Sequence, residues 1–170
     1  LDKEHRAQLI EHSQLTEIKE HPHEEYVAGV GLIKRAGYIT KNGYAYSALI
    51  GIPETQKCDV PVIGTSAWTT STEGHNEHTV RNFMRQGNFV IFIGAEGSYE
   101  PKNSPTPAGP ITLADSAASI LNYSNHVVQD LVEQGYDIDP TNRLLIGESR
   151  GAMVGMGVIA LANDFNQNIL

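Results

Sequence analysis

The sequence predicts an α/β fold built on a mostly parallel sheet with an antiparallel leading hairpin. Three short runs are apolar on both faces, which is typical of strands that helices cover on either side. Helical patterns lie between these runs, so strands and helices alternate along the chain. The hairpin comes first and is marked by Asn42-Gly43 between two strand-forming segments. Right-handed crossovers would then place helices on both faces of the sheet.

The first part of the chain is expected to be a charged helix followed by antiparallel strands. Residues 1–25 hold seven acids and three bases, and we assign them to an N-terminal helix. Its helical pattern covers residues 2–20, and His21-Pro22-His23 should end it. Residues 26–170 are assigned to the α/β domain. The leading strands of that domain are expected at residues 26–34 and, as the hairpin pair, at residues 37–52.

The later elements are expected to alternate strictly between strand and helix. The clearest helix places Leu113, Ala117, Leu121 and Val128 on one apolar face. The strands are expected over residues 60–64, 88–94 and 143–147, and the helices over residues 77–86, 113–134 and 152–161.

Length and composition exclude several classes of protein. A chain of 170 residues suits one domain, and 40% apolar with 19% charged residues indicates a soluble, globular protein. No apolar run reaches the roughly 18 residues that a membrane span needs. Cys58 is the only cysteine, which excludes a disulfide scaffold. The net charge is −8 with scattered bases, so no nucleic-acid partner is expected. No signal-peptide pattern is visible in the sequence.

The sharpest chemical motif is Gly147-Glu148-Ser149-Arg150-Gly151, which fits G-x-S-x-G. The bare pattern occurs by chance in roughly one chain of this length in fifteen. Its context is more specific, because an apolar strand precedes it and a helical pattern follows. Strand, turn and helix in that order are the setting of a nucleophile elbow.

The spacing of this motif has a physical reason. A serine on a tight strand-to-helix turn takes a strained backbone conformation, and the flanking Gly147 and Gly151 must be small because strand and helix approach closely there. The Ser149 hydroxyl then projects at the helix N-terminus, where partial positive charge stabilises a developing anion. The simpler interpretation is a glycine-rich turn that happens to contain a serine.

The elbow and its surroundings resemble the α/β-hydrolase superfamily, and the Glu before the Ser is similar to the elbow of carboxylesterases. The resemblance covers residues 26–163. It implies that Ser149 is the nucleophile for hydrolysis of a small-molecule carboxylic ester through an acyl-enzyme. The backbone N–H of Arg150 would be one oxyanion donor, and Trp68, within the loop of residues 65–69, would supply the other. The resemblance implies no cofactor and no metal.

One departure from the superfamily concerns the catalytic base. The superfamily order is Ser, then Asp or Glu, then His. All seven histidines here precede Ser149, and Asp164 is the only acid after it. Residues 26–170 therefore match the N-terminal portion of such a domain, and the strands that carry the acid and the histidine are missing.

Three interpretations of this departure remain open. In the first, a missing or separate polypeptide segment completes the sheet and the triad. This segment packs on the strand of residues 143–147, which would otherwise be an apolar edge of the sheet. In the second, the chain is a non-catalytic module used for binding or assembly, with Ser149 buried or blocked. In the third, His75 or His78 lies close to the Ser149 hydroxyl and replaces the usual base.

The remaining motifs carry weaker signals. The segment His75-Asn76-Glu77-His78 lacks the spacing of a zinc motif and has no evident third ligand, so no metal site is predicted. His126 is expected on the solvated face of its helix. The sequon Asn122-Tyr123-Ser124 falls inside a predicted helix, so we interpret it as a chance match.

Overall fold

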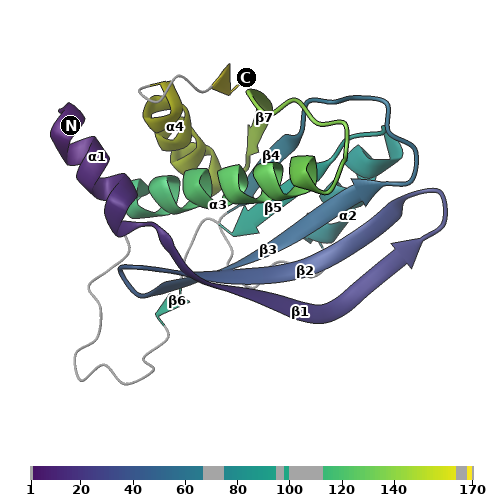
Figure 1. Ribbon diagram of the computed structural model, residues 1–170, viewed down its shortest axis with the longest axis horizontal. Helices are drawn as coiled ribbons and strands as arrows, with labels where there is room; N and C mark the ends of the chain where they lie inside the picture. Colours follow the sequence, from purple (N-terminus) through teal and green to yellow (C-terminus); the bar gives the residue numbers. More distant parts are fainter. Residues whose placement is uncertain (1, 67–74, 95–97, 100–112, 164–167, 170) are drawn as a thin grey trace.

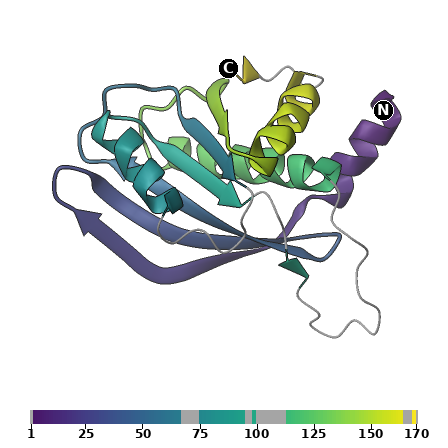
Figure 2. The ribbon, with the colours of Figure 1, turned by 180° about the vertical axis from the view of Figure 1, so that it is seen from behind.

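One twisted sheet organises the chain, with α3 and α4 on one face and α2 on the other (Figures 1 and 2). The strand order is β1-β2-β3-β5-β4-β7-β8, and β6 pairs with β3. This computed structural model describes residues 2–66, 75–94, 98–99, 113–163 and 168–169. The strands are β1 (Leu15–Val27), β2 (Gly31–Thr40), β3 (Tyr44–Pro53), β4 (Val62–Ser66), β5 (Val90–Gly94), β6 (Ser98–Tyr99), β7 (Asn142–Gly147) and β8 (Asn168–Ile169). The helices are α1 (Lys3–His12), α2 (His75–Arg85), α3 (Leu113–Glu133) and α4 (Arg150–Asn163).

The sheet has an antiparallel leading part and a parallel core, which confirms the predicted fold class. Strands β1, β2 and β3 pair antiparallel in sequence, and β3 also pairs antiparallel with β5. Strand β4 then pairs parallel with both β5 and β7, and β7 pairs parallel with β8. The antiparallel part is larger than predicted, because β1 joins it. No helix within the described ranges is long and apolar enough to cross a membrane.

The predicted hairpin is confirmed. Asn42-Gly43 lies in the turn between β2 and β3, and the Gly43 N–H donates to the Thr40 carbonyl at 2.8 Å. The register pairs Tyr38 with Tyr46, directly across the two strands. The two rings stack with their centroids 5.0 Å apart, and such aromatic cross-strand pairs stabilise a sheet.

The long N-terminal helix predicted over residues 2–20, within the segment 1–25, is wrong in its extent. Helix α1 begins after Asp2, whose side chain caps it by accepting from the His5 N–H at 2.9 Å, and it ends at His12. Residues 15–27 form β1 instead and pair with β2 along its length. Tertiary pairing therefore overrides a thin helical stripe in a charged segment.

The strand predicted over residues 26–34 is also wrong, because a turn interrupts it. Gly29 and Gly31 have φ angles of 77° and 131°, which L-residues with a side chain rarely adopt. The Glu54 carboxylate holds the turn by accepting from the Gly29 N–H at 2.8 Å. The chain thus reverses direction between β1 and β2.

Two apolar clusters fill the space on either face of the sheet. The larger lies between the sheet and helices α3 and α4, and the smaller lies under α2. In the larger cluster Tyr38 stacks on Tyr123 of α3 at 4.1 Å, and its hydroxyl lies 2.8 Å from Ser119 Oγ. Burial raises the pKa of Tyr38 well above its usual value, so this phenol stays neutral and serves packing.

The sequon residue Asn122 has a structural use. Its amide group donates to the carbonyls of Ile10 at 3.0 Å and Ser13 at 2.9 Å. These carbonyls lie at the C-terminal end of α1, where helix carbonyls lack partners within the helix. Asn122 therefore ties α1 to α3, which agrees with our interpretation of the sequon as a chance match.

Candidate functional site

The turn between β7 and α4 holds Ser149 in an unusual backbone conformation. Its φ is 56°, and it is the only non-glycine residue with a positive φ in the described part of the chain. For a residue with a side chain, this left-handed region costs free energy and persists only where the surroundings enforce it. Two backbone hydrogen bonds tighten the turn, from the Gly151 N–H to the Glu148 carbonyl at 2.9 Å and from the Ala152 N–H to the Ser149 carbonyl at 3.0 Å.

The two flanking glycines lie where backbone segments nearly touch. A Cβ atom on Gly147 would lie 2.6 Å from the Cα of Ala152, and one on Gly151 would lie 2.3 Å from the carbonyl oxygen of Thr65. Real Cβ atoms essentially never approach other atoms so closely. The turn is also tied to β4, because the Glu148 N–H donates to the same Thr65 carbonyl at 3.1 Å.

This turn lies at the carboxyl ends of the parallel strands. Thr65 near the end of β4 is in register with Gly147 at the end of β7. A small pocket opens there and is lined by Thr65, Thr79, Phe92, Ile146, Gly147 and Glu148. Ser149 itself is exposed. Ligands of open α/β sheets bind at this end of the strands, so the pocket lies where a ligand of such a sheet is expected.

The positions proposed for oxyanion binding are only partly described. Arg150 is the first residue of α4, so its backbone N–H belongs to the positive end of that helix. Trp68 lies outside the described residues. Strand β4 ends at Ser66, just before it, and Ser66 Oγ accepts from the Asn76 amide at 3.0 Å. Both side chains of this hydrogen bond are buried, so the end of β4 is fixed to the first turn of α2.

None of the histidine side chains that the structure describes is hydrogen-bonded to Ser149. His78 lies exposed on α2 and makes no hydrogen bond to the serine. His75 begins the same helix, and its side chain lies outside what the structure describes. His126 lies on α3 and lines a different pocket. The interpretation in which His78 replaces the usual base therefore has no supporting contact.

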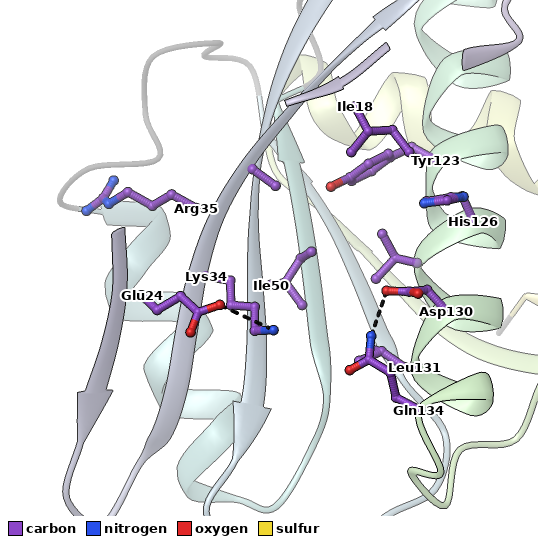
Figure 3. Close-up of a pocket in the computed structure, with 12 residues that line it drawn as sticks. Ile18, Glu24, Lys34, Arg35, Ile50, Tyr123, His126, Asp130, Leu131 and Gln134 are labelled. Carbon is purple, nitrogen blue, oxygen red and sulfur yellow. Dashed lines mark hydrogen bonds and ion pairs between the residues drawn. The ribbon is translucent and has the colours of Figure 1, made fainter. Parts of the chain in front are cut away.

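A larger pocket lies between α3 and strands β1, β2 and β3 (Figure 3). Four of its polar side chains form two pairs within the pocket. Lys34 pairs with Glu24 at 3.4 Å, and Gln134 donates to Asp130 at 2.8 Å. No residue of the Ser149 turn lines it, so we place the candidate site at the smaller pocket, which is lined by Gly147 and Glu148, the two residues before the strained serine. Across the described ranges, no three His, Cys, Asp or Glu side chains are grouped as metal ligands.

Comparison with solved structures identifies the fold. The chain is similar to acetyl xylan esterase 1 from Thermoanaerobacterium sp. JW/SL YS485, with a TM-score of 0.63 and 13% identity over 95% of this chain and 54% of that one. It is also similar to an acetyl xylan esterase from Paenibacillus sp. R4, with a TM-score of 0.59 and 15% identity over the same shares. The esterase LipA from Xanthomonas oryzae gives a TM-score of 0.57 and 14% identity over 94% of this chain and 49% of that one.

These likenesses confirm the predicted α/β-hydrolase-like fold. At such low identity they show the fold alone, and the chain spans about half the length of the esterases that it matches. No protein-family model and no curated protein sequence matches the chain.

Proposed function

We propose that this chain carries the nucleophile and the oxyanion donors of a serine hydrolase that cleaves a carboxylic ester. The observation that carries the proposal is the left-handed backbone of Ser149, at the junction of a parallel strand and a helix. Glycine would adopt this φ without steric cost. A serine, which costs free energy at this position, is therefore expected only where its hydroxyl is needed. The exposed position of the serine and the neighbouring pocket fit the same function.

The reaction would run through an acyl-enzyme. Ser149 Oγ attacks the ester carbonyl carbon while its proton passes to a base, and the carbonyl oxygen becomes an oxyanion. The N–H of Arg150 and an N–H near Trp68 stabilise that oxyanion, and each such donor contributes about 10²–10³ in rate. The tetrahedral intermediate then collapses, the alcohol leaves with a proton, and water hydrolyses the acyl-enzyme by the same route.

The base and its acid partner would come from a further polypeptide segment packed beside the end of β7, beyond Asn142 and Arg143, where β8 already pairs with it. An unassisted serine is a poor nucleophile, and no described histidine is bonded to Ser149. The elbow half of the molecule, which is β4, β7 and α4 around the Ser149 turn, also leaves large apolar side chains in solvent, where further chain would cover them. Their exposed fractions are 39% for Leu144, 58% for Met153 and 72% for Met156. The matched esterases are about twice as long as this chain, which fits the same proposal.

The second candidate is a hydrolase-like module without catalysis. It predicts a serine that is buried or blocked, whereas Ser149 is exposed. It also gives no reason for the strained φ at that position, because a module that only packs against a partner needs no hydroxyl there. The catalytic proposal accounts for both observations.

A fluorophosphonate probe on the protein at its native length tests the proposal. Intact mass and peptide mass spectrometry should locate one phosphonyl adduct on Ser149, and Ser149→Ala should abolish it. Ser47 is a control, because it is a half-buried serine of β3 in the antiparallel part of the sheet, and Ser47→Ala should leave the adduct in place. Folded protein that forms no adduct would refute the proposal and favour the non-catalytic module.

A further inference from the structure

The larger pocket, between α3 and strands β1, β2 and β3, has an apolar floor (Figure 3). Its volume is about 140 Å³, and an engineered protein cavity of about 150 Å³ holds benzene. Its apolar lining among the described residues is Ile18, Ala36, Ile50, Tyr123, Val127 and Leu131. The buried members of this set form the floor: Ala36, Tyr123, Val127 and Leu131. The floor is therefore suited to an apolar group about as large as a benzene ring.

The charged groups of this pocket lie at its rim. On the sheet side, Lys34 of β2 pairs at 3.4 Å with Glu24, which is its partner in the register of β1 and β2. On the helix side, the Asp130 carboxylate accepts from the Gln134 amide at 2.8 Å. Figure 3 shows the two pairs on opposite sides of the pocket. Glu24, Asp130 and Gln134 are exposed, so a polar rim surrounds the apolar floor.

The described side chains at the rim carry an excess of negative charge. Two of them are acids, Glu24 and Asp130, and Lys34 is a base. Arg35 also borders the pocket, but its guanidinium turns away from it and pairs with Glu77 of α2 at 3.1 Å. The amide that binds Asp130 is neutral and takes one of the roughly four acceptor positions of a carboxylate. Asp130 therefore keeps its charge and can accept from a ligand.

We propose that this pocket is a second binding site, which takes a small organic amine in its protonated form. The apolar body of the amine fills the floor against Tyr123 and Val127, and its ammonium group donates to Asp130 at the rim. A metal ion would leave the apolar floor unused, and an anion would meet the excess of negative charge. The inference does not depend on the proposed function, because no residue of the Ser149 turn lines this pocket.

The placement of charge favours a free amine over a lysine side chain of a partner protein. The ammonium group of a lysine is at the end of its chain, so a lysine that entered from solvent would carry the charge down to the apolar floor. Burial of a charge without a partner is costly. A compact amine instead turns its ring inward and keeps its ammonium group at the rim, beside Asp130.

The test is an NMR titration of the isotopically labelled protein, at its native length, with benzylammonium. At about pH 8 histidine side chains are mostly neutral, so the His126 ring at the same rim competes little with the probe. The backbone amide signals of residues 34–36 and 123–134 should shift and saturate. A titration without saturation, or with shifts that map to another part of the protein, overturns the proposal.

Two further probes test the preference for a cation. Benzyl alcohol has the same ring without the charge, and it should bind about tenfold more weakly than benzylammonium, because a hydrogen bond to an ionised group is stronger than a neutral one. Benzoate carries the opposite charge and should bind most weakly of the three. Equal affinity for benzylammonium and benzyl alcohol would mean that the pocket recognises only the ring, which overturns the proposal.

A pair of variants on α3 tests the role of Asp130. Asp130→Asn keeps an acceptor for Gln134 but removes the charge, and it should weaken benzylammonium binding about tenfold. Glu133→Gln is the matched control, because Glu133 accepts from Gln129 at 3.0 Å in the same way but does not line the pocket. Both acids are exposed, so both variants should fold. Equal losses of affinity would indicate a general attraction to an acidic helix and would overturn the proposal.

Discussion

The antiparallel leading strands and the elbow half of the sheet differ in how completely their side chains are packed and paired. Strands β2 and β3 pair residue by residue through nine consecutive partners, from Gly31↔Pro53 to Ile39↔Ala45. Their aromatic rings stack on one another and on α3, with the Tyr38 hydroxyl bonded to Ser119. In the elbow half, β7 is partly exposed and Ser149 is strained.

In this fold, one part of the sheet contributes mainly to stability, and another part holds the candidate site. The leading strands contribute buried side chains to both apolar clusters. The elbow half places a strained serine and a pocket at its surface, and it leaves apolar side chains in solvent. A protein tolerates strain and exposure at one site only when the rest of the structure is stable enough to enforce them. We therefore expect substitutions in the two halves to act on different observables.

The largest expected effect is on the leading strands. Tyr38→Ala should lower the free energy of unfolding by about 3–5 kcal/mol, because it leaves a cavity between two stacked rings. Tyr38→Phe keeps the ring and loses only the hydrogen bond to Ser119, for about 1 kcal/mol. Urea unfolding measures both variants. If the two variants lose the same stability, the stack contributes nothing and the comparison between the halves fails.

The next effect is on the elbow. Gly151→Ala places a methyl group against the Thr65 carbonyl, where an unrelaxed Cβ would lie 2.3 Å from the oxygen, and should cost about 1–3 kcal/mol of unfolding free energy. Fluorophosphonate labelling of the protein that remains folded should also fall, because the turn must shift.

Gly155→Ala on the same helix is the matched control. Its Cβ would meet only the end of the Leu145 side chain, at 3.3 Å. Replacing a helical glycine with alanine gains about 1 kcal/mol in helix propensity, so this variant should be neutral or slightly more stable. Equal losses at both positions would show that the elbow turn is no tighter than the rest of α4.

The sequence predicted the parallel core better than the leading strands. The ends of β4, β5 and β7 agree with prediction to within two residues, because strands covered on both faces are apolar throughout. Strand β1 was missed because it is an edge strand whose many charged residues need no buried face, so its pattern was interpreted as a helix.

The candidate site was predictable only in part. The motif around Ser149 and the strand before it indicated the turn, since close backbone approach requires small residues at fixed spacing. The burial of Arg143 against Ser124 and Asn125 of α3 was not predictable, because burial of a single side chain depends on where α3 crosses the sheet. No histidine follows Ser149 in this chain, so the sequence offers no candidate for the catalytic base at the usual place. Trp68 remains a prediction, as does the assignment of Ser149 as nucleophile.

A smaller effect isolates backbone strain at the elbow. Ser149→Gly should raise the free energy of unfolding by up to about 1 kcal/mol, because glycine adopts a φ of 56° without steric cost. Ser149→Ala keeps a Cβ and should leave stability nearly unchanged, so the difference between the two variants measures the strain. Thermal unfolding of the Gly and Ala variants measures this difference. A Gly variant no more stable than the Ala variant would mean that the turn stores no strain.

The smallest effect is the pH dependence of the turn that leads into β7. The Asp139 carboxylate accepts from the side chain of Asn142 and from the backbone and hydroxyl of Thr141, and these bonds lower its pKa from 3.8 to about 2. A group whose pKa is lower in the folded state than in the unfolded state stabilises the protein above its unfolded pKa, and this contribution is lost as the pH falls.

The stability advantage of the wild type over Asp139→Asn should therefore be constant above about pH 5 and shrink between pH 4 and pH 2. Because Asp139 lies at the surface and is only partly buried, the whole effect should be small and should weaken in high salt. Urea unfolding across this pH range measures it, and a difference that grows toward low pH would reverse the assigned sign. If the two proteins have the same stability at every pH, the pairing of β7 with β4 sets the turn without help from Asp139. The difference between the two halves of the sheet would then rest on packing alone.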